Sequence, residues 1–115
     1  MAAKSRDFDE ILLSSIDDSL LSLGPSVQQS IYFHLKKNFE VDKDKIPQRL
    51  EIFQEGLEKI FGIGARFLEI LIMKNLYAKL GRSLNMEKNE SLEFIKYVTA
   101  ARQNFIKEEF STKDF

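Results

Sequence analysis

Apolar residues recur at three- and four-residue spacings along most of this chain, and this spacing is typical of amphipathic helices. Asp7 suits the N-cap of the first segment, which Gly24 and Pro25 end. Pro25 also suits the first turn of a second helix, and Pro47 that of a third, because a proline there removes no helical hydrogen bond. Gly81 suits the left-handed stop of a fourth helix. The predicted helices span about residues 8–23, 25–39, 47–61, 65–80 and 91–110.

This pattern predicts an all-α fold. No segment alternates with period two over the length of a strand, and the chain has only two prolines and five glycines. We expect a compact helical bundle with four core helices in residues 1–81, the fourth of them the most apolar and central. A polar linker over residues 82–90 then leads to a C-terminal amphipathic helix and tail, residues 91–115. Residues 1–81 are expected to fold alone as one domain.

The predicted C-terminal helix carries an apolar stripe that is too hydrophobic to remain in water. Its members fall at three- and four-residue spacing: Phe94, Val98, Ala101 and Phe105. We interpret this stripe as a candidate interface, with a homodimer through the C-terminal helix as one form of it, because the linker would let the helix cross to a second copy. The alternative is docking on the chain's own core, which the same stripe satisfies equally well.

Phe33 is a large apolar residue on the polar side of the second predicted helix. It lies about 160° from Ile31 around the helix axis, on the side of Gln29 and Lys37, so it faces away from its own helix's apolar stripe. Either the fifth helix or the N-terminus folds back over it, or a second copy or a partner covers it. Phe33 is therefore a further candidate interface residue.

Composition excludes several classes of protein. A chain of 115 residues with 43% hydrophobic and 30% charged residues is long enough for one folded domain. A net charge of -1 gives no electrostatic footprint of a nonspecific nucleic-acid or anionic-membrane binder. The absence of cysteine excludes disulfides, thiol nucleophiles and thiolate metal sites, and it suits a reducing cytoplasm. Neither a secretory leader nor a membrane-spanning segment is predicted.

Two short blocks carry a resemblance to a known family. They are Ile31-Tyr32-Phe33-His34-Leu35 and Phe61-Gly62-Ile63-Gly64-Ala65, within a longer match that ends at Leu76-Tyr77-Ala78-Lys79-Leu80-Gly81. The chain resembles the Nitrosopumilus output domain family over about residues 10–81. The resemblance implies an archaeal cytoplasmic protein that serves as an output module in signal transduction. It implies neither a ligand nor an active site, and residues 82–115 lie outside it.

Tyr32 and His34 are the candidates for a ligand or switch contact. His34, the only histidine, lies about 60° from Ile31, which predicts a half-buried position at the edge of the core. The Tyr32 ring is expected to join the core while its hydroxyl reaches the rim or a buried acceptor. A structural role is the simpler interpretation of both residues.

Other charged or glycine-rich motifs do not form a catalytic or metal site. Asp17 and Asp18 point about 100° apart on a helix and are expected to be solvated. The alternating acids and lysines of residues 42–45 lack the glycine and glutamate of a calcium loop. Residues 62–64 lack the strand and lysine of a phosphate loop, and we expect them to let the third and fourth helices pack closely at a corner. The sequence therefore predicts no catalytic residue, no metal and no cofactor.

We expect a non-enzymatic protein-interaction or signalling-output module that binds a protein partner or self-associates. The first alternative is a small-ligand sensor with a pocket between the second and fourth helices. The second is a DNA-binding protein gripping phosphates with the lysines of residues 36–45, although interleaved acids make nucleic acid an unlikely partner.

Overall fold

The computed structural model has five α-helices and two short 3-10 helices in the part of the chain that it describes, residues 2–84 and 93–113. No strand occurs there, so the prediction of an all-α helical bundle is confirmed. The elements are α1 (Ala2–Leu21), α2 (Pro25–Phe39), η1 (Lys43–Gln48), α3 (Leu50–Phe61), η2 (Gly62–Gly64), α4 (Ala65–Lys79) and α5 (Phe94–Lys113).

Proline and glycine set several of the helix boundaries. Pro25 occupies the start of α2, and Gly81 follows α4 with a φ of 71°, as predicted. Two boundaries differ from the prediction. The first helix already begins at Ala2, because residues 2–6 contain good helix formers and no breaker. Pro47 lies inside η1 instead of opening α3, which begins at Leu50.

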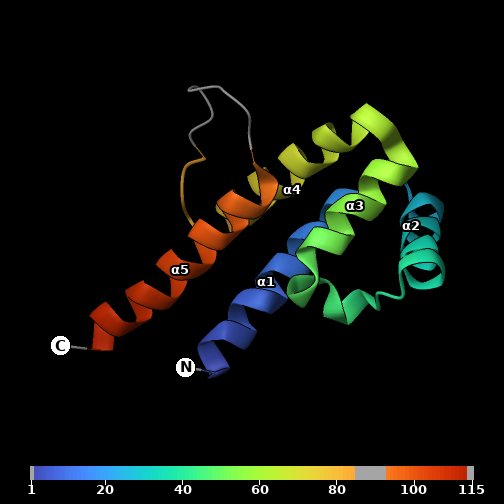
Figure 1. The fold of residues 1–115 in the computed structure, drawn as a ribbon. Coiled ribbons are helices and arrows are strands. Elements are labelled where there is room, and N and C mark those ends of the chain that lie inside the picture. Colours follow the sequence, from blue (N-terminus) through green and yellow to red (C-terminus); the bar gives the residue numbers. More distant parts are fainter. Residues whose placement is uncertain (1, 85–92, 114–115) are drawn as a thin grey trace.

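The pair of α1 and α4 forms the centre of the bundle and runs antiparallel (Figure 1). At one end of the molecule, α2 packs on α1 and α3. On the other side, α5 returns beside α1 and α4, so that both chain ends lie at the same end of the molecule (Figure 1). The central position predicted for the fourth helix is confirmed, since α4 packs on α1, α3 and α5.

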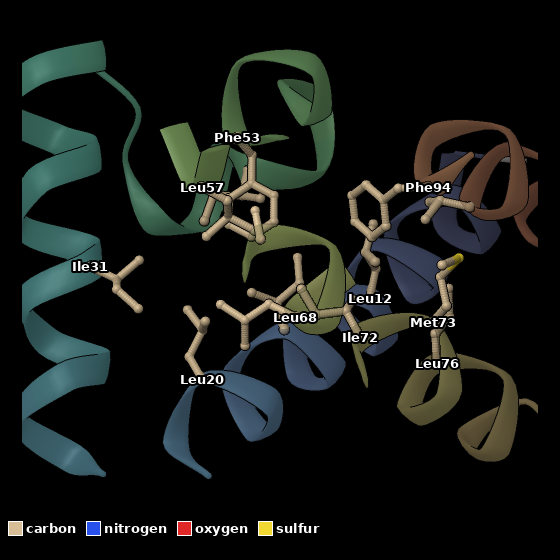
Figure 2. Close-up of a cluster of buried hydrophobic side chains, with 14 of the residues drawn as sticks. Leu12, Leu20, Ile31, Phe53, Leu57, Leu68, Ile72, Met73, Leu76 and Phe94 are labelled. Carbon is tan, nitrogen blue, oxygen red and sulfur yellow. The ribbon is translucent and has the colours of Figure 1, made fainter. Parts of the chain in front are cut away.

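A single hydrophobic cluster joins all five α-helices, and α5 is part of it. Phe94, Val98 and Ala101 are fully buried, and Phe105 packs against Phe8 of α1 with ring centroids 5.7 Å apart. Figure 2 shows the Phe94 ring among side chains of α1, α3 and α4, such as Leu12 and Phe53. The core therefore does not end at Gly81, where the sequence predicts a domain boundary.

The predicted interface stripe on α5 is thus occupied within the chain. Of the two interpretations, docking on the chain's own core is the one in the structure, because α5 packs on α1 and α4 and these four side chains lie in or against the hydrophobic core. Burying a phenylalanine contributes roughly 1.5 to 3 kcal/mol, so the docked helix is a substantial part of the fold. The homodimer through this helix stays a prediction.

Candidate functional site

An open groove of about 870 Å³ lies where α3, η2, the start of α4 and the start of α5 meet. Its charged lining residues are Glu51, Glu58, Arg66, Glu69, Glu93 and Lys96, and its apolar ones include Ile63, Ala65, Phe94 and Ile95. Lys96 pairs with Glu93 of its own segment at 3.6 Å. On the side formed by α3 and α4, three glutamates therefore face one arginine, which makes this wall acidic.

Helical spacing explains how the acidic wall forms. Glu51, Gln54 and Glu58 fall three and four residues apart, so they occupy one face of α3. Arg66 and Glu69 lie three apart in the first turns of α4. The chain reverses between the two helices at Gly62, whose φ of 61° and ψ of -134° are open only to glycine at low cost.

That conformation is the reason for a glycine at the corner, and close helix packing is not. A Cβ on Gly62 would meet no atom within 4 Å, and one on Gly64 would make only an ordinary contact of 3.8 Å with Phe61. Residues 62–64 thus form the corner between α3 and α4 through the backbone conformation of Gly62, and the missing Cβ atoms bring the two helices no closer.

Glu69 is the unusual residue of the groove. Its side chain is buried, with 6% of the residue exposed, and its Oε2 atom has no hydrogen-bond partner among the described residues. Burial raises the pKa of its carboxyl, the charge of Glu58 adds to the rise, and a hydrogen bond from the Gln54 side chain and the charge of Arg66 act in the opposite direction. The groove thus contains a carboxylate oxygen that is shielded from water and has a vacant acceptor position.

Two large apolar side chains are exposed to solvent at the corner between α3 and α4. Ile63, at the corner in η2, is 95% exposed, and Phe67, in the first turn of α4, is 77% exposed. Ile63 also lines the groove. The corner therefore carries exposed apolar surface, and Ile63 connects it to a groove whose acidic residues are exposed except for the buried Glu69.

Phe33 is also exposed, at 59%, so the expectation that α5 or the N-terminus covers it is wrong. The reason is the course of those segments: α5 lies on α1 and α4, while α1 packs on the opposite side of α2 from Phe33. The Phe33 ring contacts only its neighbours on α2, with His34 at its edge and Lys37 Nζ 5.7 Å from its centroid. Coverage of Phe33 by a partner stays a prediction.

Tyr32 has the structural role expected of it. Its hydroxyl donates a hydrogen bond of 2.8 Å to Asp17 Oδ1, which also accepts from Gln28 Nε2 and lies 3.1 Å from Lys43 Nζ. Burial and the bond to Asp17 raise the pKa of Tyr32. This network ties α2 and η1 to α1, so Asp17 is not the solvated residue that the sequence predicts.

His34 is exposed, and the prediction that it is half-buried at the core edge is wrong. Its helix buries only a narrow stripe, Ile31 and Leu35, against α1 and α3, which leaves a residue about 60° away in solvent. His34 lines a shallow hollow of about 470 Å³ with Asn38, Glu55 and Lys59. It does not line the acidic groove.

The predicted ligand pocket between the second and fourth helices does not match the position of the groove. The main neighbours of α2 are α1 and α3, and the groove lies instead between α3, α4 and α5. The sequence did contain a signal for it. Glu69 interrupts the most apolar run of the chain, residues 67–73, and a charged residue inside a central helix needs a special environment.

Further structural findings limit the chemistry of the site. The described residues contain no group of three or more His, Cys, Asp or Glu side chains arranged to hold a metal ion. Within the same residues, no helix is both long enough and apolar enough to cross a membrane. Comparison with known proteins found no matching family, no matching characterised protein and no matching solved structure. The resemblance to the Nitrosopumilus output domain family accordingly stays a prediction.

Proposed function

We propose that this protein is a non-enzymatic interaction module that docks a partner protein at the corner between α3 and α4. The observation that carries the proposal is the exposure of Ile63 and Phe67 at this corner, where Ile63 also lines the acidic groove. A signalling-output role in an archaeal cytoplasm, which the family resemblance implies, belongs to the same proposal.

Energetics support the corner as a docking surface. Each of these side chains gains roughly 1.5 to 3 kcal/mol when it is fully removed from water, and aromatic anchors commonly dominate protein interfaces. Leaving both exposed gives the folded chain nothing, whereas a partner that covers them recovers this free energy.

Charge complementarity indicates the kind of partner. Glu51, Glu58 and Glu69 line the groove behind Ile63, and Arg66 is the one basic residue on the same wall. A partner segment that brings an apolar side chain to the corner and a basic side chain to the groove matches both surfaces. Acidic partners and nucleic acid are repelled by the same glutamates.

A photoreactive residue at position 67 tests the proposal, with the same residue at position 33 as the matched control. The partner cross-linked in extract of the native host is identified, purified and titrated with four proteins: the unaltered chain and the variants Ile63→Ser, Phe67→Ser and Phe33→Ser. We expect the first two substitutions each to weaken binding at least about tenfold, and Phe33→Ser to change it less than about twofold. Cross-linking only at position 33, with loss of binding in Phe33→Ser, would move the interface to α2 and refute the proposal.

Small-ligand sensing is a second candidate, because the groove volume of about 870 Å³ falls in the range of ligand-binding pockets. A ligand bound in the groove would raise the melting temperature of the chain without any partner protein. Loss of that shift in Glu69→Gln, but not in Phe33→Ser, would assign the ligand to the groove.

A further inference from the structure

We propose that the groove between α3, α4 and α5 is a binding site for a primary aliphatic ammonium group, which seats against Oε2 of Glu69. Where the amine is a lysine of the partner, this inference deepens the proposed function and rests on it. A free aliphatic amine is the other source of the same chemistry, and it is independent of any partner.

The first step of the argument is the vacant acceptor on Glu69. A buried carboxylate is unfavourable unless its oxygens are paired, and Oε2 has no partner among the described residues although 94% of the residue is removed from solvent. The side chain lines the groove, and because Oε2 itself is covered, a group entering the groove reaches this oxygen when the carboxyl group turns toward it. A donor with a positive charge compensates both the missing hydrogen bond and the buried charge.

The surrounding charges favour a cation over an anion. Glu58 lies close enough to Glu69 to raise its pKa, and Glu51 lines the same wall. Arg66 opposes that rise, but it makes no hydrogen bond to Oε2. An anion would meet these carboxylates at close range in a partly desolvated groove, where like charges repel strongly.

The hydrogen bond from Gln54 favours an ammonium over a guanidinium. Gln54 lines the same groove and acts on the Glu69 carboxyl as a hydrogen-bond donor that lowers its pKa, so a planar guanidinium that covers both oxygens would compete with Gln54. A compact ammonium needs only the vacant oxygen and has two further donors, for which Glu58 is the neighbouring acceptor.

Apolar walls suit the carbon chain that carries the ammonium. Ile63, Phe94 and Ile95 line the groove around its acidic side. The four methylene groups of a lysine, or those of a linear diamine, can lie along such a surface while the charged end reaches Glu69. The groove therefore fits an amine at the end of an unbranched alkyl chain.

The test uses the full chain at low ionic strength and three small probes, titrated by calorimetry and by amide chemical shifts. The probes are 1,5-diaminopentane, Nα-acetyl-lysine methylamide and Nα-acetyl-norleucine methylamide, the last of which lacks the ammonium. We expect at least one amine to bind and to shift amides of α3 and α4 near Glu69, and the norleucine derivative not to bind. Glu69→Gln should weaken amine binding at least about tenfold, as expected for losing a charged hydrogen bond, whereas Glu51→Gln at the exposed rim should weaken it less than about threefold.

Comparing the affinities of the two amines shows whether the site binds a free amine or a lysine side chain of a peptide. Binding of the diamine at least about tenfold tighter than the lysine derivative assigns the site to a free amine, and the reverse assigns it to a peptide lysine. Three outcomes would overturn the inference: no binding of either amine, equal binding of the norleucine derivative, or equal amine binding by Glu69→Gln with a native melting curve. If Glu69→Gln does not fold, Glu58→Gln takes its place and should weaken the amines but not alter the fold.

Different results would refute the amine site and the proposed docking function. Phe67→Ser should retain amine binding while losing the partner protein. If Glu69→Gln loses amine binding but binds the partner with unchanged affinity, the docking corner stands and the partner does not place a lysine in the groove.

Discussion

At the scale of single residues, the partly buried Tyr32 and the buried Glu69 have opposite surroundings. The Tyr32 hydroxyl has a well-placed acceptor in Asp17, which Gln28 and Lys43 also contact. Glu69 has a hydrogen bond from Gln54, yet its other oxygen has no hydrogen-bond partner among the described residues. Satisfied networks of the first kind fix the position of a helix, whereas a half-satisfied carboxyl costs stability unless something binds to it.

The raised pKa of Glu69 predicts how stability depends on pH. Since the folded chain holds this proton more tightly than the unfolded chain, the folded state carries more protons between the ordinary glutamate pKa of 4.5 and the higher folded value. The free energy of unfolding therefore falls as the pH rises through that window and then levels off. Glutamine at position 69 cannot ionise, so the free energy of unfolding of Glu69→Gln should not show this fall. Between acid and neutral pH, the variant should therefore lose less stability than the unaltered chain.

Urea unfolding at closely spaced pH values measures this effect, with Glu51→Gln as the control for removing a groove carboxyl. The comparison isolates Glu69 because Glu58 and Arg66, the charged groups that act on it, and Gln54 are unchanged in both variants. An unchanged slope in Glu69→Gln would mean that the Glu69 carboxyl is not responsible.

At the scale of helices, α2 and α3 approach closely at Gly56. A Cβ built on Gly56 of α3 would lie 2.5 Å from Leu35 Cδ2 and 3.5 Å from the ring of Phe39, both on α2. Leu35 is fully buried, so its methyl group has little room to move. Gly56 thus allows α2 to lie against α3, a close approach that the spacing of apolar residues does not predict.

Gly56→Ala should consequently destabilise the protein even though alanine is the better helix former. Overpacking a core costs about 1 to 3 kcal/mol, against a gain of about 1 kcal/mol in helix propensity, so we expect a net loss of about 1 kcal/mol. Gly64→Ala is the matched control, since its φ of -67° and open surroundings accept a Cβ. Thermal unfolding should show a lower melting temperature for the first variant and an equal or higher one for the second; equal gains in both would contradict the close contact.

At the scale of the whole molecule, α5 closes the same core that the first four helices begin. Arg102 of α5 pairs with Asp9 of α1 at 2.7 Å and lies over the Phe8 ring, while Arg82 pairs with Glu108. These contacts surround the buried face of α5 with partly exposed ion pairs that fix its position beside α1. Without α5, Phe8 would lose the Phe105 ring and the Arg102 guanidinium that pack against it, and independent folding of residues 1–81 stays a prediction.

Two phenylalanine truncations measure how much the packing of α5 contributes to the stability of the fold. Phe94→Ala should lower the free energy of unfolding by roughly 3 to 5 kcal/mol, because it empties a fully buried site in the core. Phe33→Ala, on an exposed side chain, should change it by less than about 0.5 kcal/mol. Denaturant unfolding at several protein concentrations gives both values, and a midpoint that rises with concentration would instead assign Phe94 to an assembly of chains.

The sequence alone determined the helices, because the three- and four-residue spacing of apolar positions and the placement of Pro25 and Gly81 are local properties. It also determined that Phe33 faces away from its helix's core stripe, and that α4 is central. Other features depend on which surfaces meet in space, and no local pattern encodes that. The stripe of Phe94, Val98, Ala101 and Phe105 fits a partner or the chain's own core equally well, and only the packing of α5 on α1 and α4 decides between them. The groove around Glu69 likewise exists only because the reversal at Gly62 sets one face of α3 beside the first turns of α4 and α5.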